Sequence, residues 1–169
     1  MDRAPTIDLL DAADVDQLRE LWLQLHHHHQ SVSPVRPFID DESSWSRRRS
    51  GYVEILANGG FALAARTDGE LVGYALVRVH QHPDDSWQLG EPYAEVWTLV
   101  VDERHRGKGI GSALLDEVDW RLHGEGIRGL VIGAMVGNDD AIRLYESRGL
   151  TPGWLQLYRT APGVDRERT

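Results

Sequence analysis

Apolar side chains recur at helical spacing in two segments of the N-terminal third of the chain. In residues 11–30 they fall every three or four positions behind acidic residues, which predicts a helix with one buried face. The apolar positions of this segment are Val15, Leu18, Leu21, Trp22 and Leu25. Two prolines in residues 31–38 interrupt the pattern. Residues 40–60 predict a second helix, which begins on acidic and serine residues and ends at Asn58-Gly59-Gly60.

The other segments predict strands that alternate with helices. Residues 61–67 and 70–81 predict antiparallel strands joined by Asp68-Gly69, a strong hairpin signal. The remaining patterns predict strands at 6–10, 93–101, 129–136 and 154–159 and helices at 110–126 and 138–150. This order predicts an α/β (α+β) fold, with a mixed, largely antiparallel central sheet flanked by helices on both faces. We expect residues 1–160 to form a single domain and residues 161–169 a flexible tail.

Composition and charge narrow the class of protein. The chain has 169 residues, 41% of them hydrophobic, which suits one packed domain. Lys and Arg number 18 against 27 Asp and Glu, and a net charge of −9 argues against nucleic acid or an anionic membrane as partner. The absence of cysteine excludes disulfides and thiolate chemistry. No export signal or run of 18 apolar residues occurs, so we expect a cytoplasmic location.

A basic, glycine-rich stretch, RHRGKGIG at residues 104–111, lies between a predicted strand and a predicted helix. Glycines there let main-chain N–H groups approach an anion, and the positive end of the helix dipole adds to the attraction. The spacing differs from a Walker A loop, because Lys108 precedes Gly109 and no Ser or Thr follows to hold Mg²⁺. It differs from a Rossmann fingerprint because Ser112 replaces the third glycine. A turn that only redirects the chain is the alternative.

Two motifs in the C-terminal half resemble those of the GCN5-related N-acetyltransferases, the GNAT family. Arg106, Gly109 and Gly111 match the family's acetyl-CoA-binding motif Arg/Gln-x-x-Gly-x-Gly/Ala, which follows a strand. The second family motif, Asn-x-x-Ala-x-x-Leu-Tyr-x-x-x-Gly-Phe, lies on the next strand–helix pair. The residues that match it are Asn138, Ala141, Leu144, Tyr145 and Gly149, with Leu150 in place of Phe.

The chain departs from the family at its C-terminal end. Many members have two strands after the tyrosine-bearing helix, whereas only residues 154–159 predict one here. A shortened sheet edge and a homodimer that exchanges its last strand are the two interpretations we retain.

The resemblance implies the acyl-CoA N-acyltransferase fold and acetyl-CoA as co-substrate. It implies that the strand at 93–101 diverges from its neighbour, so that main-chain groups pair with the pantetheine arm. It also implies that the glycine turn binds the pyrophosphate, with added charge from Arg106 and Lys108. The residues expected at the co-substrate are Leu99, Val100, Val101, Arg106, Gly107, Lys108, Gly109, Ile110, Gly111, Ser112, Asn138, Ala141 and Tyr145.

Acetyl transfer to an amine needs an acid for the departing thiolate and a base for the amine. By resemblance the Tyr145 phenol is the acid, and a core tyrosine is the alternative. Glu95 is the only carboxylate in residues 93–101, and burial would raise its pKa toward a value that suits a base. Several family members place a Glu base on this strand. An exposed Glu on the polar face and deprotonation through water are the alternatives.

Four consecutive histidines at residues 26–29 raise the question of a metal. At most His26 and His29 share a helix face, and two ligands without carboxylate support make a poor site, so we predict no metal. The resemblance implies that the first two helices close over the acceptor. The expected acceptor residues are then His26, His29, Phe38, Trp45 and Trp97. The run Arg47–Arg49 predicts a solvated side of the second helix.

These observations predict an N-acetyltransferase that moves the acetyl group of acetyl-CoA directly to a primary amine in a ternary complex. The net charge and the acidic residues 40–42 and 84–85 favour a cationic small molecule or peptide amine as acceptor. Two alternatives remain. One is an acyltransferase with a longer acyl donor, and the other is a CoA-binding sensor or structural domain without turnover.

Overall fold

The computed structural model describes residues 4–160. Its centre is a five-stranded sheet in the order β1-β2-β3-β4-β5. All neighbouring strands are antiparallel except β4 and β5, which are parallel. The strands are β1 (Thr6–Leu9), β2 (Phe61–Thr67), β3 (Glu70–His80), β4 (Tyr93–Val101) and β5 (Leu130–Ile132). The prediction of a mixed, largely antiparallel sheet is confirmed.

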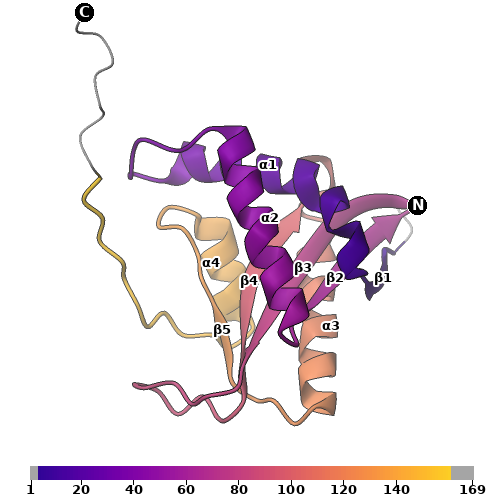
Figure 1. Ribbon diagram of the computed structural model, residues 1–169, viewed down its shortest axis with the longest axis vertical. Coiled ribbons are helices and arrows are strands. Elements are labelled where there is room, and N and C mark those ends of the chain that lie inside the picture. Colours follow the sequence, from indigo (N-terminus) through magenta and orange to yellow (C-terminus); the bar gives the residue numbers. More distant parts are fainter. Residues whose placement is uncertain (1–3, 161–169) are drawn as a thin grey trace, which may run out of the picture.

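Helices cover both faces of this sheet (Figure 1). They are the 3-10 helices η1 (Ala12–Leu18) and η2 (Glu103–His105) and the α-helices α1 (Arg19–Val32), α2 (Asp41–Ala57), α3 (Ile110–Gly124) and α4 (Asp139–Ser147). The segment 11–30 was expected to be one helix, but it begins as η1 before α1 continues. The apolar spacing of residues 15–25 does not distinguish the two, because both place neighbouring turns over one face.

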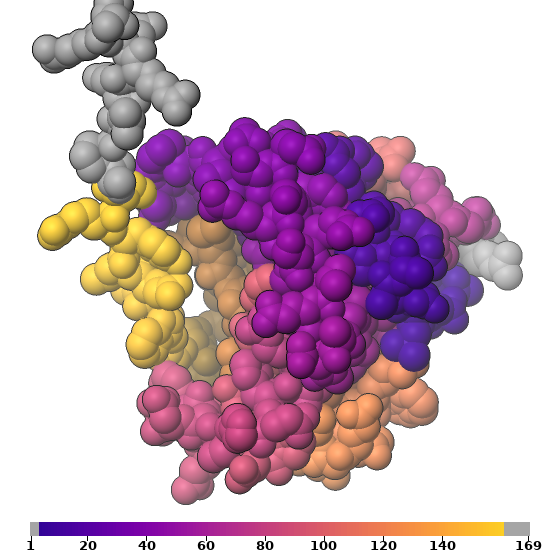
Figure 2. Space-filling view, viewed as in Figure 1, coloured from indigo at the N-terminus to yellow at the C-terminus, as the bar shows by residue number. Residues whose placement is uncertain are grey.

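The sheet separates two apolar clusters. One packs α1 and α2 against strand residues such as Tyr74 and Leu76, and Figure 2 shows these helices covering the near face of the molecule. The other packs α3 and α4 against residues such as Val77 and Val96. Side chains of one strand alternate between the two clusters, as the pleat requires.

The C-terminal strand is the clearest wrong prediction. Residues 154–159 run beside the body without strand pairing, and Trp154 and Leu157 are 77% and 87% exposed. The strand expected at 129–136 is also short, since β5 contains only three residues. An alternating apolar pattern cannot form a strand unless a paired edge satisfies its backbone groups. The strand-exchanged homodimer stays a prediction, and the tail 161–169 lies outside the described residues.

No helix among the described residues is long and apolar enough to cross a membrane. The cytoplasmic location stays a prediction.

Candidate functional site

On its β5 side, β4 has no neighbouring strand along its second half within residues 4–160. It pairs with β5 only from Ala94 to Val96. The pairing with β3 shifts at the same place, because Val77 pairs with Val96 and Leu76 with Thr98, which leaves Trp97 as the bulged residue. Within residues 4–160, the β5 side of residues 97–101 therefore lacks a paired strand. This stretch, the open segment of β4, contains Leu99, Val100 and Val101 and can accept an extended ligand by main-chain hydrogen bonds.

The glycine turn follows the open segment and begins α3. Gly107 and Gly109 have φ values of +74° and +81°, a left-handed conformation that an L side chain adopts only with strain. Gly109 is the N-cap of α3, so the next three N–H groups, of residues 110–112, have no carbonyl partner one turn earlier in the helix. The Arg106 Nε donates a hydrogen bond to the Val101 carbonyl at 3.2 Å. The turn thus presents N–H donors beside the end of β4.

Asp102 holds the start of this turn by hydrogen bonds, and the sequence analysis did not identify this residue. Its side chain is 3% exposed and accepts hydrogen bonds from Arg104 and from Gln24 of α1, both at 3.0 Å. The His105 ring also lies 3.1 Å away. The Arg104 hydrogen bond, above all, holds the pKa of Asp102 well below its usual range. The polar residue at the end of an apolar strand was the available signal.

Tyr145 projects from α4 into the cluster beneath the sheet. Its residue is 9% exposed, and burial raises the pKa of its phenol to about 12. The phenol forms no hydrogen bond within the described part of the chain. It borders a cavity of about 240 Å³ between α3, β5 and α4. A neutral phenol with an available O–H is suited to donate a proton.

The rest of the second motif positions α4. Asn138 caps this helix, and its side chain accepts from the Ala141 N–H at 3.4 Å. Leu144 lies beside Gly111 of α3, where an added Cβ would be 3.5 Å from Leu144 Cδ2. The second motif and the glycine turn are therefore in contact.

Glu95 lies on the opposite face of the sheet from Tyr145. Its carboxylate is 3.0 Å from His80 Nε2 and 3.7 Å from Arg78 Nη1. Arg78 in turn lies over the Trp97 ring, on the side that α1 and α2 cover. The carboxylate is half-buried, with a guanidinium and an imidazole as neighbours, so it is neither the isolated buried group nor the freely exposed one that we considered.

The expected acceptor residues divide into two groups. His26 and Trp45 are 5% exposed and belong to the packing of α1 and α2, and the His26 ring lies against Phe38 at 5.6 Å. Side chains so covered offer little surface to a ligand, and the acceptor roles of His26 and Trp45 stay predictions. Trp97 belongs to the open segment itself, and His29 feels the positive charge of Arg48, which lies over the Trp97 ring. Burial, above all, lowers the pKa of His29 to about 4, so its ring is neutral at pH 7.

The histidine run does not form part of a metal site in the described residues. Among residues 4–160, no group of three or more His, Asp or Glu side chains is arranged to hold a metal ion. His27 instead pairs with Asp41, with 2.9 Å between Nε2 and Oδ1.

Known proteins resemble this chain both in sequence and in fold. The family model described as "Acetyltransferase (GNAT) family" matches residues 15–150. A mycothiol acetyltransferase of Acidothermus cellulolyticus is 38% identical over 164 residues, which cover 86% of this chain and 46% of that protein. The chain thus spans about half the length of the curated relatives that it matches.

Two solved structures share the fold. A GCN5-related N-acetyltransferase from Ralstonia eutropha JMP134 superposes with a TM-score of 0.74 at 20% identity, covering 94% of this chain and 99% of that one. The aminoglycoside N-acetyltransferase AAC(6')-Iy in complex with CoA gives a TM-score of 0.68 at 16% identity, covering 95% of this chain and 98% of that one.

Proposed function

Because the chain belongs to the acetyltransferase (GNAT) family, we propose that it is an N-acetyltransferase that moves the acetyl group of acetyl-CoA to a primary amine. Transfer is direct, in a ternary complex. The observation that carries this proposal is that the two family motifs meet beside the open segment of β4. Gly111 of the first motif lies against Leu144 of the second.

Acetyl-CoA would extend along the open segment of β4. The unpaired side of residues 97–101 would accept the pantetheine arm as an added strand, which supports the roles expected for Leu99 and Val101. The N–H groups of residues 110–112 would bind the pyrophosphate at the start of α3. One N–H of the open segment would stabilise negative charge on the thioester oxygen.

The transfer step requires two proton movements on opposite sides of the thioester. The amine nitrogen attacks the carbonyl carbon, a C–N bond forms, and the C–S bond breaks. The Tyr145 O–H would protonate the departing thiolate, and its raised pKa keeps that proton in place at pH 7. Glu95, directly or through water, would accept the proton of the amine, and His80 at 3.0 Å would orient its carboxylate.

The acidic residues 40–42 and 84–85 do not indicate which class of amine is the acceptor. Asp40 accepts from the Ser43 N–H, Asp41 pairs with His27, and Asp84 accepts from two N–H groups of its own loop. These carboxylates have local partners, which weakens the case for a cationic acceptor built on them. The name of the curated relative makes unacetylated mycothiol one amine to test, beside other small amines and peptides.

The test is to incubate the protein with acetyl-CoA and a panel of amines and to measure free thiol. We expect thiol release that depends on one class of amine and that slows by about 10²- to 10⁴-fold when Tyr145 is replaced by Phe. CoA binding without thiol release for any amine would favour the sensor or structural domain. Release only with a longer acyl-CoA would favour the other donor.

A further inference from the structure

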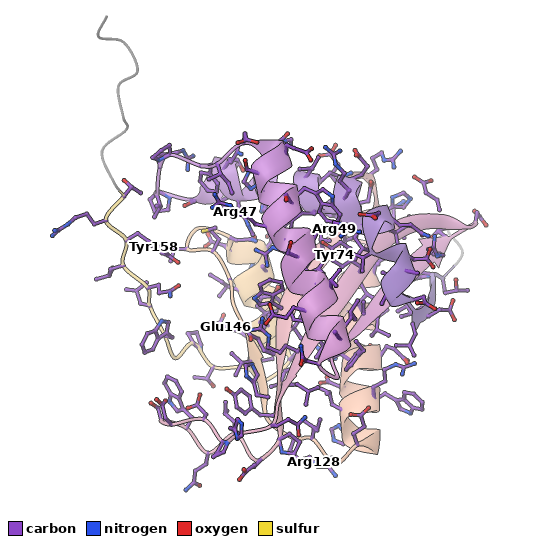
Figure 3. All side chains as sticks on the ribbon, in the orientation of Figure 1. Arg47, Arg49, Tyr74, Arg128, Glu146 and Tyr158 are labelled. Atoms are coloured by element: carbon purple, nitrogen blue, oxygen red, sulfur yellow. The ribbon has the colours of Figure 1, made fainter. Side chains whose placement is uncertain are left out.

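Arg48 lies between two tryptophan rings, contrary to the solvated position expected for residues 47–49. Its guanidinium carbon is 4.0 Å from the centre of the Trp22 ring and 4.3 Å from that of Trp97. Its neighbours differ from it, since Arg47 is exposed and Arg49 pairs with Asp16. Figure 3 labels Arg47 and Arg49 on α2, above Tyr74 of the sheet.

The guanidinium of Arg48 has no anionic partner within the part of the chain that the structure describes. No carboxylate lies within ion-pair distance and no hydrogen bond leaves its nitrogens. The Arg48 side chain is half-buried. Among the described residues, every fully buried side-chain nitrogen has a hydrogen-bond partner, so the unpartnered nitrogens of Arg48 must be in contact with solvent. The Trp22 and Trp97 rings lie against the guanidinium, and its N–H donors have no other protein partner among the described residues. Such a group is ready to bind a carboxylate or phosphate by two parallel hydrogen bonds.

The position of Arg48 connects it with the transfer site. Trp97 is the bulged residue where β4 separates from β5, and Glu95 is two residues earlier on the same strand. A second guanidinium, that of Arg78, also lies over the Trp97 ring at 5.1 Å, but it is 3.7 Å from the Glu95 carboxylate. Of the two cations on this ring, only Arg78 has an acidic neighbour among residues 4–160.

We propose that Arg48 binds an anionic oxygen group, a carboxylate or phosphate, of the acceptor, so that the acceptor carries this group in addition to its amine. The inference rests on the proposed function, because it places the acceptor on the side of the sheet that α1 and α2 cover. It replaces the cationic acceptor expected from net charge with an acceptor that has charges of both signs. The global charge of −9 does not describe this position, where two guanidinium groups share one ring.

The test compares matched amines that differ in the anionic group. Suitable pairs are L-phenylalanine with L-phenylalaninamide and glucosamine 6-phosphate with glucosamine, with kcat/KM calculated per neutral amine. We expect the wild-type protein to prefer the anionic member of at least one pair by about 10- to 100-fold. Arg48→Gln should reduce that preference to about one, while Arg48→Lys should retain part of it. Arg47→Gln, one residue earlier on α2, is the matched control and should leave the preference unchanged.

The outcomes separate this inference from the proposed function. Acetylation with no preference in either pair, or with a preference that survives Arg48→Gln, would overturn the inference alone. If no amine is acetylated, titration of the CoA-loaded protein with the same four compounds, followed by tryptophan fluorescence, decides it. Binding of an anionic member that Arg48→Gln abolishes supports the site, and equal binding by both proteins refutes it. If Arg48→Gln does not fold, the smaller loss expected for Arg48→Lys serves as the criterion.

Discussion

At the scale of single residues, the chemistry depends on surroundings that the residue type does not specify. Tyr145 has a pKa raised to about 12 because it is buried, whereas a tyrosine on the surface has an ordinary value near 10. The motif assigned Tyr145 a role by resemblance, and the structure supplies a buried phenol that retains its proton. Glu95 shows the reverse case. The sequence singled it out, but its partners His80 and Arg78 come from another strand.

Tyr145→Phe should lower kcat by about 10²- to 10⁴-fold, the usual contribution of a general acid, because the thiolate then leaves without its proton. The substitution removes one oxygen and keeps the ring that packs in the cluster, so the dissociation constant for CoA should change little. Steady-state kinetics and calorimetric titration with CoA measure the two quantities. Tyr158→Phe, on the exposed C-terminal segment, is the control. Equal loss of kcat and of CoA affinity would mean that the phenol serves packing or binding instead.

At the scale of elements, the sequence predicted the glycine turn but did not show where the open segment of β4 begins. The turn is a local feature, since Gly107 and Gly109 adopt positive φ values where the motif has its glycines. The divergence of β4 from β5 depends on pairing between residues about 36 positions apart, Val96 and Ile132. The resemblance implied this divergence, but no pattern within either strand shows where pairing ends.

Gly109→Val tests the turn against a position with the same backbone strain. Gly59 has a φ of +85° against +81° for Gly109, and an added Cβ meets no atom within 4 Å at either residue. Both substitutions to Val should therefore lower the free energy of unfolding by a similar amount, about 1–2 kcal/mol. Only Gly109→Val should abolish CoA binding, because its side chain stands where the N–H groups approach the pyrophosphate. Urea melts measure the free energy of unfolding of each variant, and calorimetric titration of the folded variants measures their affinity for CoA. Equal CoA affinity in the two variants would contradict the assignment of the pyrophosphate to this turn.

At the scale of the whole molecule, Asp102 joins parts of the fold that are far apart in the chain. It connects the end of β4 with Gln24 of α1 and with Arg104, which also pairs with Glu70 of β3. The loss of this carboxylate should therefore affect global stability as well as the turn. Because its pKa is lowered in the folded protein, the stabilisation is complete above the unfolded value of about 3.9 and is lost as the pH falls further.

Asp102→Asn should lower the free energy of unfolding at pH 7 by about 1.5–3 kcal/mol, the usual value of a hydrogen bond to a charged group. The difference from the wild-type protein should shrink as the pH falls below about 4, since Asp102 of the unfolded chain then binds a proton that the folded protein does not. Urea melts at a series of pH values measure this. Asp16→Asn, which removes the partner of Arg49 at the surface, should have little effect at any pH. Parallel wild-type and Asp102→Asn curves down to pH 2 would contradict the assignment.

The sequence by itself determined the features that depend on near neighbours. These are the helices, the Asp68-Gly69 hairpin, the glycine turn and the two motifs of the family, because spacing of a few residues defines each of them. Only the tertiary structure decided the features that depend on pairing and burial between distant segments. It left residues 154–159 without a partner strand, buried His26 and Trp45, and placed Arg48 between Trp22 and Trp97. A run of three arginines looks solvated in sequence, because the rings that enclose the middle one come from α1 and β4.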